Sequence, residues 1–332
     1  MDVPMRRIRM EDLAEECGVS VATVSRVLTD KPGVRADIRE RVRKAAAAMG
    51  YSAFVPSAGQ KVALVASRAA MVDMSRSQFT LHVVEGLRER AAQLGMVLET
   101  LTATGGMAEA VAGSDADGFL LLTPQGDEEV AEVAALNRQV VLVNGEDPTM
   151  RLSSVAPCNR AAAAQATAHL LRLGHKRILF MTRSGRKTIA ERHAGWAEEM
   201  ARAGLPVTPD LVVEVEDWIP DLAARTIKAR LAQGPRDFTA ILCAGDSLAY
   251  GALIGLAEAG VSVPHEVSVL GFDGLPQCDF QMPPLSAVTI PMRHLGAVAL
   301  DLLRDQLAGG GMPPRRIELA CPVVERASTA PV

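Results

Sequence analysis

The stretch "GVSVATVSRV" at positions 18–27 decides how the front of this chain folds. Gly18 suits the positive φ of a tight turn, and the Ser20 hydroxyl can cap a new helix by accepting a hydrogen bond from a free backbone N–H group. Helical spacing then places Val24 and Val27 on one inward face. The stretch therefore predicts a tight turn followed by a short amphipathic helix that begins at Ser20.

Two further helices complete a small bundle around this stretch. The preceding segment "MEDLAEECG" carries Met10, Leu13, Ala14 and Cys17 at helical spacing, and the turn "TDKPG" leads to a third apolar stripe of Ile38, Val42, Ala45, Ala46 and Met49. We predict a three-helix helix-turn-helix head over residues 1–50. In such a motif the second helix enters the DNA major groove with its first residues against base edges.

The outer face of the second helix carries groups suited to DNA. Hydroxyls on Thr23 and Ser25 can bond phosphates, and the planar fork of Arg26 can pair with O6 and N7 of guanine. The predicted DNA-contacting residues are Ser20, Val21, Ala22, Thr23, Ser25, Arg26 and Tyr51. An ordinary capped helix with one solvated arginine is the alternative that the motif leaves open when it is taken alone.

Charge is distributed unevenly along the chain. Residues 1–61 hold 11 Lys/Arg and 8 Asp/Glu, a net of +3, and the remainder holds 24 and 31, a net of -7, so that the two sum to -4. A small basic unit on an acidic body is typical of a nucleic-acid-binding head. Solvated helix faces would give a similar excess, so the charge alone does not decide the function.

From Lys61 onward, short apolar runs alternate with helices. The predicted strands are "KVALVAS", "MVLETLT", "GFLLLT", "VVLVN", "RILFM", "LVVEV", "AILCA" and "VSVLGFDG", and the predicted helices include Leu81–Gly95, Ala161–Gly174 and Leu248–Gly260. Continuous apolar strands interleaved with helices indicate buried parallel sheets. The pattern predicts an α/β body with two doubly wound sheets.

Several classes of protein are not supported by the sequence. The longest apolar run, Ser247–Ala257, is far shorter than the roughly 20 residues of a membrane-spanning helix. The N-terminal residues lack an apolar signal core, so we expect the cytoplasm. Cysteines at positions 17, 158, 243, 278 and 321 are scattered, which predicts neither a disulfide framework nor a zinc site.

No catalytic constellation is recognisable. Ser247 in "GDSLA" lacks the glycine spacing of a nucleophile elbow, and "RSGRKT" at Arg183–Thr188 is not a Walker phosphate loop. His175 in "LGHKRI" is interpreted as a turn residue rather than a base. We expect a protein that is not an enzyme and that carries no cofactor or metal.

The motifs resemble the LacI/GalR (lactose-repressor) family of bacterial transcription regulators. The head sequence carries the likeness, and the segments "ADGFLLL", "RHAGW", "CAGDSLAYGAL", "VPHEVSVLGFDG" and "PVVERAST" continue it in family order. The resemblance implies a periplasmic-binding-protein-like body of two α/β subdomains, about 62–157 with 291–321 and about 158–290. It also implies a homodimer that binds a palindromic operator, with affinity set by a small molecule in the cleft.

The resemblance places the effector contacts on six residues: Phe79, Asn144, Arg192, Trp218, Asp246 and Asp273. Carboxylates accept bonds from sugar hydroxyls, an aromatic ring covers an apolar face, and a guanidinium grips a hydroxyl pair or an acid. Asp246 and Asp273 could instead be helix caps, and Trp218 and Phe79 could be core residues. Arg192 is expected at the start of a helix, where the helix dipole disfavours a cation and another reason is needed.

Departures from the family refine these expectations. Asn144 stands where a carboxylate is usual, Cys158 stands where Asp is common, and "SQFT" replaces an "NPFF"-like loop, which together favour an acidic or phosphorylated ligand over a neutral sugar. Pro56 and Gly59 disfavour a hinge helix in the short linker 51–61. Either Phe54 or Val55 inserts into the minor groove, or no residue does, and we favour the second.

Two other functions stay open at this point. A pure small-molecule sensor would use the same body but would leave the basic head unexplained. A regulator with a degenerate cleft would respond to a protein partner instead of a metabolite.

Overall fold

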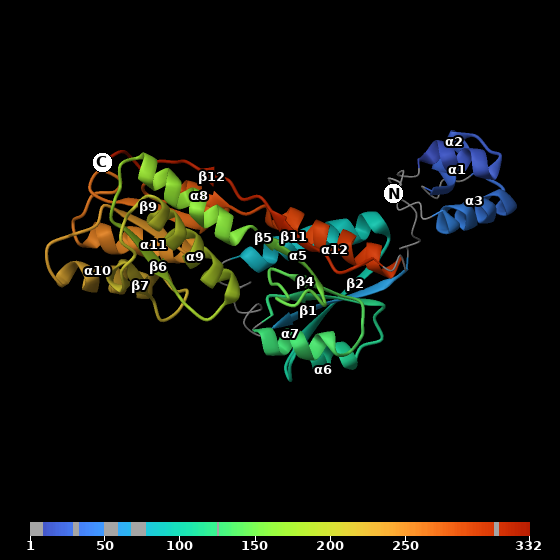
Figure 1. The fold of residues 1–332 in the computed structure, drawn as a ribbon, viewed down its shortest axis with the longest axis horizontal. Helices are drawn as coiled ribbons and strands as arrows, with labels where there is room; N and C mark the ends of the chain where they lie inside the picture. The colour runs from blue at the N-terminus through green and yellow to red at the C-terminus, as the bar shows by residue number, and fades with distance from the viewer. Residues whose placement is uncertain (1–8, 29–32, 50–58, 68–77, 125, 309–311) are drawn as a thin grey trace.

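Figure 1 shows the computed structural model of the chain, which describes residues 9–28, 33–49, 59–67, 78–124, 126–308 and 312–332. Tyr51 and most of the linker 51–61 lie outside these residues, so the expectations placed on them stay predictions. The described residues form a small helical head at one end and a body with two sheets.

The head is a three-helix bundle, as predicted. Its helices are α1 (Met10–Cys17), α2 (Val21–Leu28) and α3 (Ala36–Ala48). Gly18 ends α1 with φ 60°, the left-handed turn expected there. Leu13, Val24, Val27 and Val42 are fully buried and form the centre of the head's own core. The apolar stripes of three short helices are thus buried against one another.

The first sheet of the body has six strands in the order β11-β5-β4-β3-β1-β2. Its strands are β1 (Lys61–Ser67), β2 (Val97–Ala103), β3 (Gly118–Leu122), β4 (Val140–Val143), β5 (Ser153–Pro157) and β11 (Arg316–Leu319). All neighbouring strands are parallel. This sheet defines the subdomain that we call subdomain 1.

Successive residues of β1 explain why helices cover both faces of this sheet. Val62 and Leu64 join the cluster that includes helices α5 (Phe79–Leu94) and α12 (Met292–Leu307), whereas Ala63 and Val65 join a separate cluster with α6 (Met107–Ala112) and α7 (Asp127–Ala134). Alternate side chains of a strand point to opposite faces. A strand that is apolar at every position therefore needs a helical layer on each side.

The second sheet also has six strands, in the order β12-β10-β9-β8-β6-β7. Its strands are β6 (Ile178–Thr182), β7 (Val212–Glu214), β8 (Ala240–Cys243), β9 (Ser268–Asp273), β10 (Ser286–Thr289) and β12 (Val323–Val324). Only β12 is antiparallel to its neighbour. The helices of this part, subdomain 2, are α8 (Asn159–Arg172), α9 (Lys187–Arg202), α10 (Pro220–Ala232) and α11 (Asp246–Glu258), with η1 (Pro209–Leu211) and η2 (Pro276–Phe280) as short 3-10 turns.

The chain crosses between the two sheets three times. It leaves subdomain 1 after β5, returns between β10 and α12, and leaves again between β11 and β12. The fold class is therefore the one predicted, an α/β body of two doubly wound sheets behind a helical head. The sequence reasoning did not list β5, β10, β11 and β12 as strands, because these strands are short and all four lie at or next to a sheet edge.

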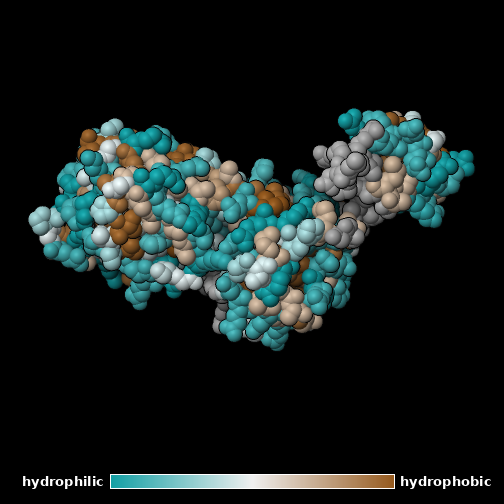
Figure 2. All heavy atoms as spheres, viewed as in Figure 1, coloured by the Kyte–Doolittle hydropathy of each residue, from teal (hydrophilic) through white to brown (hydrophobic). Residues whose placement is uncertain are grey.

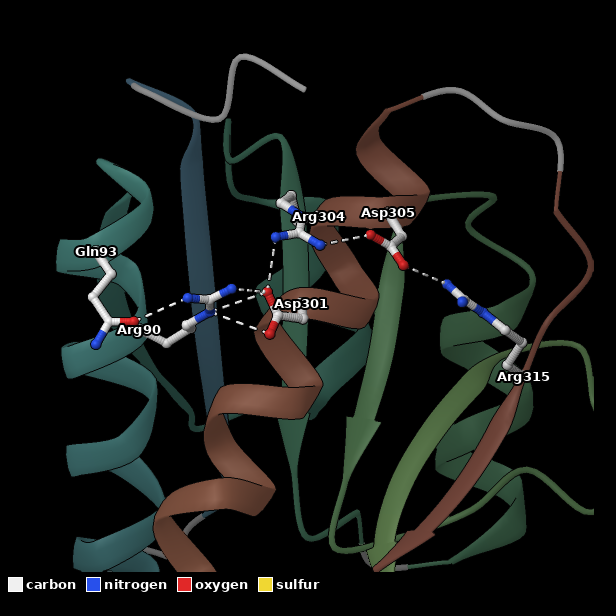
Figure 3. Close-up of polar contacts among 6 residues, drawn as sticks. All are labelled: Arg90, Gln93, Asp301, Arg304, Asp305 and Arg315. Atoms are coloured by element: carbon white, nitrogen blue, oxygen red, sulfur yellow. Dashed lines mark hydrogen bonds and ion pairs between the residues drawn. The ribbon is translucent and has the colours of Figure 1, made fainter. Parts of the chain in front are cut away.

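Figure 3 shows how polar residues tie the helices of subdomain 1 together at their outer end. Arg90 of α5 donates to Asp301 of α12 from Nη2 at 2.8 Å, and Arg304 Nη1 lies 3.0 Å from the same carboxylate. Asp305 accepts from Arg304 at 2.9 Å and from Arg315 at 3.1 Å. Single exposed ion pairs stabilise little, but this connected set links α5, α12 and the approach to β11.

Candidate functional site

The carboxyl ends of the parallel strands in both subdomains meet around one cleft. Its lining residues are Phe79, Asn144, Arg186, Thr188, Ile189, Arg192, Trp218, Ala244, Ser247 and Asp273. Ligands of open α/β sheets bind outside the carboxyl ends of the strands. Five of the six predicted effector contacts are thus brought together, although they lie far apart in the sequence.

Arg192 is the central cation of this cleft, and its side chain is only 6% exposed. Its Nε donates to Asn159 Oδ1 at 2.8 Å, and its Nη1 donates to the Ala244 carbonyl at 2.6 Å and to Asp273 Oδ1 at 3.2 Å. The guanidinium carbon also lies 3.7 Å from the centroid of the Phe272 ring. Burial lowers the pKa of Arg192, while Asp273 opposes that shift.

The expectation that Arg192 begins a helix is wrong, because α9 begins at Lys187 and Arg192 lies in its second turn. The dipole argument therefore does not apply to it. Instead, Arg192 is stabilised by its neighbours, because a buried charge is retained where it is paired and hydrogen-bonded, as Arg192 is with Asp273. Among the described residues no hydrogen bond is made to Nη2, the guanidinium nitrogen that remains for a ligand.

Asn144 faces Arg192 from subdomain 1. Its Nδ2 donates to Thr123 Oγ1 at 3.4 Å, and its Oδ1 is a buried acceptor without a hydrogen-bond partner among the described residues. A buried polar atom without a partner is costly, so a ligand hydroxyl or amine would satisfy it. Asn144 is thus poised to receive a donor from the cleft.

Backbone strain is concentrated around the cleft. Four of the six described non-glycine residues with positive φ are Gln78, Thr123, Asn144 and Asp273, with φ of 63°, 52°, 56° and 119°. Such conformations cost of order 1–3 kcal/mol for a non-glycine residue and persist where the surrounding structure holds them. Here they end or follow strands or precede a helix beside the cleft, and Asn144 and Asp273 are themselves lining residues.

Asp246 differs from the other predicted contacts because it is fully buried and does not line the cleft. Its Oδ2 accepts from the Leu275 backbone at 2.8 Å and from the Cys278 thiol at 3.3 Å. A Cβ at Gly271 would lie 2.5 Å from Asp246 Oδ1, so the glycine of "GFDG" makes room for this carboxyl group. Burial and the neighbouring Asp273 raise the pKa of Asp246 well above its usual range.

Trp218 and Phe79 line the cleft from opposite subdomains. The half-buried Trp218 ring lies 5.9 Å from the Arg186 guanidinium carbon, and a Cβ at Gly245 would come within 3.0 Å of the ring. Phe79 opens α5 and is 6% exposed. The two aromatic residues therefore add apolar surface to the cleft, and Phe79 also belongs to the core of the body, against which Trp218 packs, as the alternative interpretation allowed.

Sequence reasoning missed Arg186, Thr188 and Ser247 as lining residues. It examined Arg186 only as part of a non-Walker loop and Ser247 only as a possible nucleophile. The available signal was their position after the carboxyl end of a predicted strand, because Arg186 directly precedes α9 and Thr188 and Ser247 lie in the first turns of α9 and α11. Arg186 is partly exposed and has no ion-pair partner among the described residues, so it adds a second cation to the cleft.

Two contacts close the cleft from its sides. Lys187 of α9 lies 2.9 Å from Glu146, which follows β4, and Glu146 in turn lies 3.0 Å from Arg316. On another side, Gln277 donates to Gln78 at 2.8 Å. The cavity between the lobes is about 40 Å³, enough for a few water molecules. A ligand of sugar size therefore needs the subdomains to separate.

The second helix of the head presents the predicted DNA-facing residues. Ser20 Oγ accepts from the Thr23 backbone at 3.1 Å, so the predicted cap is confirmed, and it also lies 2.8 Å from Thr23 Oγ1. Val21, Ala22 and Arg26 are exposed. Figure 2 shows a largely hydrophilic face on the head. Ser20 and Thr23 use their hydroxyls within the helix start, which leaves Arg26 as the longest polar group on this face.

His175 follows the turn that ends α8, where its N–H donates to the Leu170 carbonyl at 3.2 Å, and its side chain is buried. Its Nδ1 lies 2.9 Å from Thr239 Oγ1, and its Nε2 lies 3.0 Å from Ser268 Oγ and 3.1 Å from the Ala330 carbonyl. Burial lowers its pKa. The imidazole links Thr239, just before β8, and Ser268 of β9 to the C-terminal segment, and it lies outside the cleft lining.

Comparison with known proteins agrees with this architecture. The model for bacterial regulatory proteins of the lacI family matches residues 9–53, and the model for the periplasmic-binding-protein-like domain matches residues 167–329. The chain is 29% identical to the HTH-type transcriptional regulator reg1 of Streptomyces lividans over 97% of this chain and 96% of that protein. It is also 29% identical to the HTH-type transcriptional repressor CytR of Escherichia coli K12, over 96% of each.

Solved structures give the same result. The complex of the transcriptional regulator CelR with cellobiose superposes with a TM-score of 0.74 at 27% identity, covering 97% of this chain and all of that one. The lac repressor dimer bound to operator and the anti-inducer ONPF superposes with a TM-score of 0.73 at 23% identity, covering 98% of this chain and 100% of that one, and this likeness concerns the fold. The head is therefore a lacI-family helix-turn-helix domain, the body carries a periplasmic-binding-protein-like domain, and the chain as a whole is similar to transcriptional regulators of the lacI family.

No helix among the described residues is long and apolar enough to cross a membrane. Within the same residues, no group of three or more His, Cys, Asp or Glu side chains is arranged to hold a metal ion.

Proposed function

We propose that this chain is a cytoplasmic transcriptional repressor that binds a palindromic operator as a homodimer, without enzymatic activity, and is controlled by a small ligand in the cleft. Residues 1–50 form the DNA-binding unit, 51–61 the linker and 62–332 the effector-binding and dimerisation unit. The observation that carries the proposal is the buried Arg192, which offers Nη2 to a cleft between two lobes. CytR of Escherichia coli K12, which matches 96% of this chain, is named a transcriptional repressor.

The ligand is a small carbohydrate-like or acidic metabolite. Arg186 and Arg192 face a single lining carboxylate, Asp273, which leaves a net positive charge for an acid or phosphate group. The unpaired Asn144 Oδ1 and the bounding aromatic rings suit a hydroxylated ring. The CelR structure holds cellobiose, which supports a carbohydrate-like skeleton.

Homodimerisation is supported by an apolar patch on subdomain 2. Phe280 and Met282 are 82% and 89% exposed, and Ile254 of α11 is 42% exposed. Tyr250 of α11 contacts Cys278 of η2 at 3.6 Å, so the two elements that carry the patch lie side by side. Large apolar side chains gathered on a surface typically mark a protein interface. We call Ile254, Phe280 and Met282 the apolar patch.

Thermal unfolding with a panel of metabolites tests the proposal. The panel contains neutral sugars, sugar acids and sugar phosphates, each at high concentration. A true ligand at a hundred times its dissociation constant adds about 2.7 kcal/mol to the free energy of unfolding. Arg186→Gln should lose the response to acidic ligands and keep its unliganded melting temperature, because Arg186 is partly exposed and outside the core.

DNA binding is tested separately, by selecting sites from random duplexes and titrating the selected site with and without each stabilising ligand. A ligand that stabilises the protein but leaves operator affinity unchanged would contradict effector control. If no metabolite stabilises the protein while operator binding is intact, control by a protein partner replaces the proposal.

A further inference from the structure

Two of the free cysteines lie where the chain crosses between the subdomains. Cys158 follows β5 and precedes α8, on the first crossing, and Cys321 follows β11 and precedes β12, on the last. Rotation of one subdomain against the other has to pass through these crossing segments. Neither thiol belongs to the residues that line the cleft.

The backbone holds the two cysteines next to each other. The Cys158 N–H donates to the Leu319 carbonyl at 3.0 Å, and the Cys321 thiol lies 3.2 Å from the same oxygen. In the pairing of β11 with β5, Leu319 is the partner of Pro157, the residue before Cys158. Cys158 and Cys321 therefore lie one and two residues beyond a paired position at the ends of neighbouring strands. The Cys158 backbone N–H and the Cys321 thiol thus meet at one carbonyl oxygen, which places the two cysteines beside each other.

Exposure and ionisation distinguish the roles of the two thiols. Cys158 is partly exposed, whereas Cys321 is 2% exposed, so a reagent reaches Cys158 first. The hydrogen bond from Cys321 lowers the pKa of Cys158 to about 6, and the same contact raises the pKa of Cys321. This shift favours the thiolate of Cys158, the form that attacks a disulfide. Burial raises the pKa of Cys243 and Cys278 instead, so these thiols stay inert.

We propose that Cys158 and Cys321 form a redox pair that closes reversibly to a disulfide in the presence of a low-molecular-weight disulfide such as oxidised glutathione. The Cys158 thiolate attacks one sulfur of the reagent, forms a mixed disulfide and releases one glutathione thiolate. Cys321 then loses its proton and attacks the Cys158 sulfur, which forms the Cys158–Cys321 bond and releases the second glutathione as a thiol. Cytosolic disulfides of this kind are typically transient and regulatory.

The disulfide would connect the crossing segments to the cleft. Asn159 is adjacent to Cys158 and accepts the hydrogen bond from Arg192 Nε at 2.8 Å. A disulfide between the first and last crossings would hinder their relative movement and hold Asn159 in one position. This consequence rests on the proposed function: in the oxidised protein, the ligand should no longer change operator affinity.

Mass spectrometry of the full chain tests the bond itself. Reduced protein is incubated with oxidised glutathione at pH 7, alkylated and digested. We expect one cross-linked peptide pair that contains positions 158 and 321, and its loss on addition of dithiothreitol. Cys321→Ser should accumulate a stable glutathione adduct on Cys158, whereas Cys158→Ser should form neither adduct nor bond. Cys243→Ser is the matched control and should form the bond as the native chain does.

A wild-type adduct on Cys158 that never resolves, or equal reaction at all five cysteines, would overturn the proposal. Thermal unfolding of the reduced Ser variants shows whether they are folded. If a variant is misfolded, its missing bond is disregarded and the wild-type result alone decides. Operator binding is then measured for reduced and oxidised protein. If the disulfide forms but the effect of the ligand on operator affinity is unchanged, the regulatory role is overturned. If neither reduced nor oxidised protein binds an operator, the proposed function is refuted and the redox pair is unaffected.

Discussion

Arg26 and Arg192 show how one residue type takes two roles according to burial. Arg26 is exposed on α2, whereas Arg192 is enclosed and held by Asn159, Ala244 and Asp273. The exposed guanidinium keeps its whole donor fork for a partner outside the chain. The buried one keeps only part of its fork, because the rest fixes its orientation.

Arg26→Ala tests base reading by the head. If Arg26 pairs with guanine, the substitution should cost about 1–3 kcal/mol on the selected operator and relax preference at one symmetric base pair in each half-site. Fluorescence anisotropy on operator and random duplexes, at fixed salt, provides the measurement. An equal loss on both DNAs would show a phosphate contact instead.

Asp147→Asn tests a buried carboxylate in the loop after β4. Asp147 is 1% exposed. Burial alone would raise its pKa, but bonds from the Thr149 hydroxyl and from the backbone of Thr149, Arg151 and Leu152 outweigh burial and lower the pKa to about 2. Because the folded pKa is below the unfolded value, the contribution is complete above pH 4 and is lost as the pH falls toward 2.

We expect Asp147→Asn to lower the free energy of unfolding at pH 7 by about 2 kcal/mol, with a smaller difference near pH 3. Urea denaturation at the two pH values measures this. A difference that does not change with pH would contradict the ionised role.

Pairs of helices in both subdomains approach closely at glycines. A Cβ at Gly296 of α12 would lie 2.3 Å from the Val83 carbonyl of α5, and a Cβ at Gly195 of α9 would lie 2.1 Å from the Arg160 carbonyl of α8. At these distances the neighbouring helix backbone would have to shift. The glycine of "RHAGW" thus belongs to helix packing, whereas its arginine belongs to the cleft.

Gly296→Ala tests this packing. Alanine favours an isolated helix by about 1 kcal/mol, but here the clash with α5 should reverse the sign and destabilise the protein by about 1–3 kcal/mol. Gly113→Ala is the control, because its φ is -82° and its Cβ would be 3.3 Å from the Glu109 carbonyl. Chemical denaturation of both variants decides the question, and a stabilised Gly296→Ala would show that α5 and α12 have room to separate.

At the scale of the whole molecule, an ion pair spans the two subdomains. The Lys187 and Glu146 side chains are 37% and 21% exposed, so the pair stabilises the closed form by about 0.5–1 kcal/mol. Glu146→Gln should therefore shift the chain toward an open form with a larger radius of gyration in small-angle scattering at low salt. Glu258→Gln breaks a pair with Lys228 inside subdomain 2 and should leave the radius unchanged. The same radius of gyration in both variants would show that the Lys187–Glu146 ion pair does not hold the subdomains closed.

The apolar patch makes a prediction about assembly. Replacing Phe280 and Met282 together by serine should shift the protein from dimer to monomer in sedimentation velocity, because it removes the two most exposed apolar side chains of the patch. Met312→Ser, at a residue 53% exposed outside the patch, is the control. Unchanged circular dichroism establishes that the variants are folded, and a dimer that survives both serines would place the interface elsewhere.

The sequence by itself determined the three-helix head and the alternation of strands and helices in the body, because these depend on local patterns. The Ser20 cap, the Gly18 turn and the inward Val24 and Val27 follow from spacing within ten residues. Apolar strands alternating with helices were enough for the two doubly wound sheets. Most of the cleft was located through the family resemblance carried by short motifs.

Only the tertiary structure decided which side chains share one environment. It placed Asp246 beneath the cleft, brought Arg186 into the lining and moved Arg192 from a helix start to a buried pair with Asp273. It also brought Cys158 and Cys321, which are 163 positions apart in the sequence, to the same carbonyl oxygen, a contact that spacing along the chain does not encode. Burial, pairing and ionisation depend on neighbours from distant segments, and those neighbours exist only once both sheets have formed and the chain has crossed between them.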